Sequence, residues 1–158
     1  MSNQNSSTNT KTIEVGKFYL IFDGSRTGHP GFVIWKDDEK NRYLVIITES
    51  DKFGNKSKRE TDKRHLTDLD YPTESKVAKS YIKKRPMLCK SKDIGKKELV
   101  GMQFHHSDFE KVLFVSRQKP VMSPSNKNKN NRWTHLESTR TGCVTYLIKQ
   151  LLLCQYGN

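Results

Sequence analysis

The sequence is poor in apolar residues and contains no long apolar run. Only 33% of its 158 residues are hydrophobic, and no stretch approaches the roughly 20 apolar residues that cross a bilayer. The polar amino terminus also lacks the apolar segment of a signal peptide. We therefore expect no membrane association and a cytoplasmic location.

Cysteine is scarce as well. Cys89, Cys143 and Cys154 are an odd number and include no Cys-x-x-Cys pair. This pattern argues against a disulfide framework and against a zinc ribbon, and it favours buried, unreactive thiols.

A metal site is not indicated either. His105, His106 and Asp108 are close in sequence, but adjacent side chains point apart on a helix or a strand and no third ligand follows at a suitable spacing. We expect neither a metal nor another cofactor.

The few apolar residues are unevenly distributed, and this predicts the domain organisation. Residues 1–12 are polar and are expected to form a disordered tail, and the polar run at 123–132 lies in a predicted linker, 121–134. A basic β-barrel domain is predicted over 13–120, and an amphipathic helix over 135–158.

Acidic residues are outnumbered by basic ones. The 29 Lys and Arg residues against 17 Asp and Glu give a formal charge of +12 and a pI near 9.7. Such a field attracts polyanions, and RNA or DNA is the expected partner.

Three strands are predicted at the start of the domain. The apolar runs at 16–22, 31–36 and 42–48 are bounded by turn residues, and the last two flank a polar connection at 37–41 that is typical of a hairpin. Around Pro86, one or two further strands are predicted, with the proline at an edge or a break.

Helices are expected only near the end of the domain and beyond it. Ser107 and Glu110 form the pattern of a capping box for a short helix over 107–118, although its apolar residues also fit a strand. The apolar spacing in 143–154 predicts the C-terminal amphipathic helix. Because strands and helices do not alternate, the fold class is mainly β, a small barrel with one or two short helices.

The loop at 24–31 carries the first candidate site residues. It matches no nucleotide-binding motif, but it holds Arg26, whose guanidinium can bind phosphate, and His29, which can transfer a proton near neutral pH. An ordinary hairpin loop is the alternative.

The end of the third strand carries further candidates. In a small barrel, Thr48, Glu49 and Ser50 are expected to lie beside the loop that ends the first strand, where hydroxyls can bind phosphate oxygens. The alternative is that Thr48 is an ordinary strand residue and Ser50 a turn residue.

The nucleic-acid-binding candidates are basic side chains with one aromatic among them. The segment 79–97 alone has eight Lys and Arg residues against one acid. The candidates are Lys17, Lys36, Lys58, Arg59, Lys79, Tyr81, Lys83, Lys84 and Arg85.

The first fifty residues resemble the PemK/MazF-type toxins, which are SH3-like barrels that cleave RNA without a metal. The resemblance rests on Gly16–Leu20, on Gly24-Ser25, on Gly28–Ile34, and on Tyr43–Thr48 followed by Glu49-Ser50. It departs from the family where His29 replaces the usual Arg before the loop proline and where Glu49 interrupts the family's Thr-Ser.

The resemblance implies an endoribonuclease in which the RNA 2′-hydroxyl attacks the adjacent phosphate. His29 then transfers protons, Arg26 stabilises charge, and Thr48 with Ser50 orients the phosphate. It further implies control by an antitoxin, of protein or of RNA as in the related ToxN-like toxins, and a possible homodimer.

Two other functions remain open at this point. A non-catalytic nucleic-acid-binding barrel, such as an accessory protein of a mobile element, would have the same charge. A protein-interaction module would use the apolar stripe at 144–152 to bind a partner.

Overall fold

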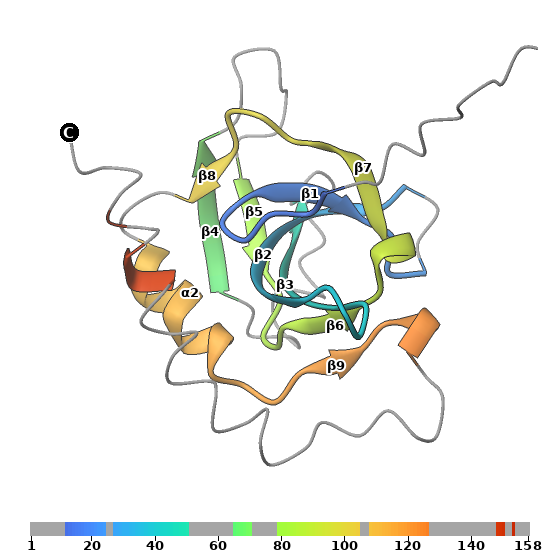
Figure 1. Ribbon diagram of the computed structural model, residues 1–158. Coiled ribbons are helices and arrows are strands. Elements are labelled where there is room, and N and C mark those ends of the chain that lie inside the picture. Colours follow the sequence, from blue (N-terminus) through green and yellow to red (C-terminus); the bar gives the residue numbers. More distant parts are fainter. Residues whose placement is uncertain are drawn as a thin grey trace, which may run out of the picture.

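The structure is a computed structural model, and the part that it describes is mainly β (Figure 1). The described residues are 12–24, 27–50, 65–70, 79–104, 108–126, 148–150 and 153, without the side chains of 50, 65–70 and 79–81. The expected mainly β class is confirmed. The expected disordered tail lies outside the described residues, apart from Thr12.

Within the described residues, nine strands form a single sheet. They are β1 (Phe18–Ile21), β2 (His29–Asp37), β3 (Arg42–Ser50), β4 (His65–Asp70), β5 (Lys79–Ile82), β6 (Met87–Cys89), β7 (Ile94–Glu98), β8 (Gln103–Phe104) and β9 (Val121–Met122). Their main order is β7-β1-β2-β3-β5-β4-β8. The three strands predicted from the first fifty residues are therefore confirmed, with β2 and β3 forming the expected antiparallel hairpin.

The sheet is strongly curved. The register of β2 on β3 shifts between Val33 and Trp35, and such bulges bend a strand. The two ends of the strand order, β7 and β8, follow each other directly in sequence, and Figure 1 shows the sheet winding round towards them. Phe104 of β8 thereby lies 5.0 Å from Phe18 of β1, measured between ring centroids.

Two short strands pair with β3 along the edge that is opposite to β2. Tyr43–Val45 pair with β6, whereas Thr48–Ser50 pair with β5. Pro86 lies between β5 and β6, where its missing N–H interrupts no ladder hydrogen bond. The predicted break at this proline is confirmed.

Apolar side chains lie on both faces of the central strands. Alternation along β3 places Leu44 and Ile46 in one cluster, and Tyr43, Val45 and Ile47 in the other. The first cluster also contains the aromatic trio Phe18, Phe32 and Phe104.

The predicted short helix is α2 (Phe109–Ser116). Its N-cap is Asp108, so the expectation of Ser107 as the cap was wrong; Asp108 makes no capping hydrogen bond and instead accepts one from Lys111 Nζ at 3.0 Å. Val112, Leu113 and Val115 of α2 complete the first apolar cluster.

The C-terminal helix is described only at residues 148–150 and 153, which are helical. Ile148 is fully buried in the first apolar cluster, so this helix packs against the β domain at that residue. The rest of the predicted apolar stripe lies outside the described residues. Within the described part of the chain, no helix has the length and apolar character needed to cross a membrane.

Residues 121–126 belong to the folded domain, which corrects the predicted linker boundary. The strand β9 pairs in parallel with β6, and Ser123 and Asn126 are buried. Hydrogen bonds explain why this polar run packs: Ser123 Oγ donates to Asp93 Oδ2 at 2.8 Å, Ser125 Oγ donates to Asp93 Oδ1, and Asn126 Nδ2 donates to the Leu88 carbonyl at 2.8 Å.

The close packing at Gly31 gives a test of this fold. A Cβ at Gly31 would lie 2.4 Å from Ile21 Cγ1 and 2.6 Å from Val45 Cγ1. We predict that Gly31→Ala lowers the free energy of unfolding by about 1–3 kcal/mol, because overpacking outweighs the gain of about 0.4–1 kcal/mol from restricting the unfolded chain. Urea denaturation measures it, with Lys96→Ala at an exposed position of β7 as the control; an unchanged midpoint for Gly31→Ala would contradict the packing.

Candidate active site

The ends of four strands meet at one rim of the sheet. His29 begins β2 and pairs with Ile21, the last residue of β1, while Asp23 follows two residues later. Glu49 lies near the end of β3, and Lys83 directly follows β5 and donates its backbone N–H to the Ile47 carbonyl at 2.9 Å. The expected proximity of the end of the third strand to the first loop is confirmed.

The side chains of Asp23, His29, Glu49 and Lys83 form a polar group that we call the rim cluster. Lys83 Nζ lies 2.8 Å from Asp23 Oδ2 and 3.4 Å from Glu49 Oε1. His29 Nε2 lies 3.8 Å from Asp23 Oδ2 and 3.9 Å from Glu49 Oε1. One imidazole and one ammonium group are thus each placed between the same two carboxylates.

Exposure separates the members of the rim cluster into two kinds. The Asp23 side chain is only 7% exposed, whereas those of His29, Glu49 and Lys83 are 20–25% exposed. Asp23 is therefore placed to hold Lys83 and His29, and the other three are accessible from solvent. A carboxylate, an imidazole and an ammonium group in one accessible place are suited to proton transfer and to binding of an anion.

Thr48 does not belong to this site, which corrects its predicted role. It is completely buried, and its hydroxyl donates to the Pro30 carbonyl at 2.9 Å. Alternation along β3 turns Thr48 to the same side as Leu44 and Ile46, away from Glu49. A hydroxyl buried in this way cannot orient a bound phosphate. Ser50 pairs through its backbone with Ser80, and its side chain lies outside the described residues, as does the whole of Arg26.

Two of the predicted nucleic-acid contacts are paired with acids. Lys17 Nζ lies 3.5 Å from Glu98 Oε1, with 44% of its side chain exposed. Lys36 Nζ lies 2.9 Å from Asp38 Oδ2 and donates to the Ile13 carbonyl at 3.1 Å. Lys36 therefore has a structural role in fixing the start of the domain, while Lys17 remains largely accessible.

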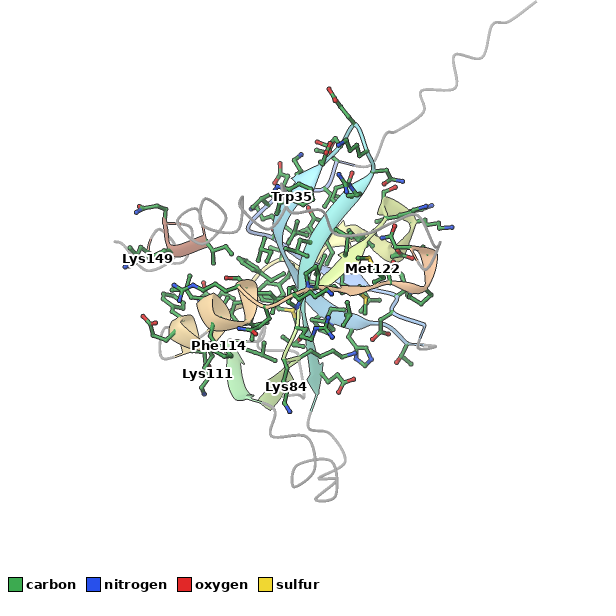
Figure 2. All side chains as sticks on the ribbon, turned by 90° about the horizontal axis from the view of Figure 1, so that it is seen from below. Trp35, Lys84, Lys111, Phe114, Met122 and Lys149 are labelled. Carbon is green, nitrogen blue, oxygen red and sulfur yellow. The ribbon has the colours of Figure 1, made fainter. Side chains whose placement is uncertain are left out.

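The three predicted nucleic-acid contacts that follow β5 lie in different surroundings. Lys83 belongs to the rim cluster, and the neighbouring Lys84 is exposed and extends outward (Figure 2). Arg85 instead donates from Nε to the Lys119 carbonyl at 2.6 Å and from Nη2 to the Pro120 carbonyl at 3.1 Å, which fixes the segment that leads into β9. The side chains of Lys79 and Tyr81, and the whole of Lys58 and Arg59, lie outside the described residues.

No catalytic or binding role was predicted from the sequence for Asp23 or for Glu49. The position of Glu49 depends on the bulge between Val33 and Trp35, which shifts the hairpin register by one residue and which the sequence does not reveal. Gly31 pairs with Ile47, and extending this antiparallel register by two residues puts His29 across from Glu49. No local pattern in the sequence links Asp23 to Lys83, because the two residues are 60 positions apart.

The described residues offer neither a metal site nor a reactive thiol. No group of three metal-ligating side chains occurs among them, and the His105-His106 pair lies outside them. Cys89 is buried, and this burial, with the nearby charges of Asp93 and Asp23, raises the pKa of its thiol well above the ordinary value. A protonated, inaccessible thiol is a poor nucleophile.

Comparison of the chain with protein-family models, curated proteins and solved structures finds no significant match. The resemblance to PemK/MazF-type toxins is therefore still a prediction.

The coupling between Lys83 and Asp23 can be measured directly. We predict that Lys83→Met lowers the free energy of unfolding by about 1–3 kcal/mol, because it leaves a nearly buried carboxylate without this partner. In Asp23→Asn/Lys83→Met the loss should be smaller than the sum of the two single changes.

Urea denaturation of the four proteins in this cycle gives the coupling free energy. Lys40→Met, at an exposed turn position, controls for the loss of a positive charge. A coupling below about 0.3 kcal/mol would contradict a structural ion pair at this site.

Proposed function

We propose that this protein is a toxin-like, metal-independent endoribonuclease whose active site is the rim cluster. The observation that carries the proposal is the convergence of His29 and Glu49, 3.9 Å apart, beside the Lys83 ammonium group at a solvent-accessible rim. RNA cleavage by its own 2′-hydroxyl needs a base, an acid and a positive charge near the phosphorane, and these three groups can supply them.

The proposed reaction proceeds as follows. The Glu49 carboxylate accepts the proton of the 2′-hydroxyl as the 2′-oxygen forms its bond to phosphorus. The bond from phosphorus to the 5′-oxygen breaks, and protonated His29 donates a proton to that leaving oxygen. Lys83 stabilises the negative charge on the phosphorane oxygens. The products are a 2′,3′-cyclic phosphate and a 5′-hydroxyl, and DNA is not a substrate because it lacks the nucleophile.

Asp23 has a positioning role in this proposal. It is the least exposed member of the rim cluster, and its Oδ2 atom lies near both Lys83 Nζ and His29 Nε2. Holding these cationic groups in place before RNA binds lowers the reorganisation that the reaction requires. Thr48, in contrast, has no part in the chemistry.

Charge favours RNA as the substrate. The formal charge of +12 attracts a polyanion over distance, while the rim cluster alone does not repel one once His29 is protonated, because its two carboxylates then face two cations. The resemblance to PemK/MazF-type toxins adds a controlling antitoxin, of protein or RNA, and a homodimer to the proposal.

The proposal is tested with purified protein, a mixed-sequence RNA and a DNA of the same sequence, all in EDTA. We predict fragments from RNA alone, ending in cyclic phosphate, with the rate falling about 10²–10⁴-fold in His29→Ala and in Glu49→Gln. Lys40→Ala serves as the control outside the site.

The outcomes separate the candidate functions. RNA that stays intact but is retarded on a gel in a salt-sensitive way would overturn catalysis and favour the nucleic-acid-binding barrel. Cleavage that persists in both His29→Ala and Glu49→Gln would instead place any active site away from the rim cluster.

A further inference from the structure

Phe22 is an aromatic residue exposed at the rim. Its relative exposure is 41%, although it lies between buried Ile21 and the nearly buried Asp23 side chain. Its backbone N–H donates to the Asp93 carbonyl at 2.7 Å, so the chain at this position is held against the residue that directly precedes β7. The exposed ring is therefore carried by a fixed backbone.

The ring lies close to Gly28, the loop residue that precedes His29. A Cβ at Gly28 would lie 3.2 Å from Phe22 Cδ1 and 3.0 Å from Leu20 Cγ, and the φ of Gly28 is +68°. Glycine at this position thus allows the backbone to approach the ring closely. Phe22 and His29 consequently belong to the same turn of chain at the end of β1 and the start of β2.

The ring and the rim cluster lie on two sides of the same rim. Ile21 and His29 are paired, and alternation along β1 turns Leu20 to the side opposite Ile21. Phe22, the residue after β1, lies on the side of Leu20, since both side chains come close to Gly28. The rim therefore has a polar side with Asp23 and His29, and an aromatic side with Phe22. A ligand that uses both sides must bend over the rim.

We propose that Phe22 stacks against an unpaired base of single-stranded RNA while the adjoining phosphate lies at the rim cluster. This inference rests on the proposed function and specifies its substrate. Aromatic side chains bind unstacked bases through their π-faces, with little dependence on sequence. A duplex keeps its bases stacked inside and cannot bend over the rim in this way. The site therefore takes single-stranded RNA and discriminates against paired RNA.

Phe114 provides a matched control. It is also an exposed phenylalanine, with a relative exposure of 54%, but it lies on α2, which is beside β4 and β8 and not beside β7 (Figures 1 and 2). Substitution at Phe114 removes an aromatic ring that is at least as exposed as Phe22, at a position on α2.

In the kinetic test, Phe22→Ala is compared with Phe114→Ala on an unpaired RNA and on a hairpin that pairs the same sequence. We predict that Phe22→Ala raises KM for the unpaired RNA about 5–100-fold, which is the loss of one stacked base, with kcat within twofold. Phe114→Ala should match the original protein, and the hairpin should be a poor substrate for all three. An unchanged KM in Phe22→Ala would overturn the inference while leaving the nuclease proposal intact.

A binding test that needs no cleavage separates the two proposals. In Phe22→Trp, fluorescence should be quenched by an unpaired 2′-O-methyl RNA, which cannot be cleaved, and not by its duplex; Phe114→Trp should show no such change. Quenching without any RNA cleavage would support base stacking and overturn the nuclease. Equal quenching at both positions, or none at position 22, would overturn the stacking site.

Discussion

The burial of β3 on both faces is the constraint on which the rest of the structure depends. Residues 43–48 are all buried, and alternate side chains enter the two apolar clusters. The strand also fills its hydrogen bonds on both edges, with β2 along one and with β6 and β5 along the other. A one-residue slip of β3 would exchange the members of both clusters, so its register is strongly fixed.

The same register determines where the rim cluster forms. Glu49 is the first partly exposed residue after the buried run, and the hairpin register puts it across from His29. The rigid hairpin therefore fixes two of the four groups. Lys83 enters through β5, which pairs with the end of β3, and it compensates the desolvation of Asp23 by a direct contact at 2.8 Å. The polar site thus forms where the buried part of β3 ends.

Hydrogen bonds to Asp93 and Leu88 hold residues 121–126 in the folded domain, as the burial of apolar side chains holds β3. Asp93 receives the hydroxyls of Ser123 and Ser125 together with the backbone N–H of Lys90, and the Leu88 carbonyl accepts from Asn126. A linker was predicted here because the segment has few apolar residues. Composition does not show whether its polar side chains find hydrogen-bond acceptors in the folded domain. The partners lie 30 to 38 residues earlier in the chain, and only folding reveals them.

The strands were predictable because their signals are local. Apolar runs between turn residues located β1, β2 and β3, and Pro86 located the break between β5 and β6. The loop that leads into His29 was also recognisable from its residues. The helix cap was not, since Ser107 and Asp108 are both residue types that are preferred at an N-cap, and the N-cap of α2 is Asp108.

The sequence by itself determined the mainly β class, the hairpin, the basic charge and the loop that leads into His29. These features follow from composition and from local patterns of apolar and turn residues. Tertiary structure alone decided that Thr48 is buried while Glu49 is accessible, that Arg85 binds backbone carbonyls, and that Lys83 meets Asp23. These outcomes depend on which strands pair and which side of each strand faces the core. Both are set by the burial of the whole chain and not by any one segment.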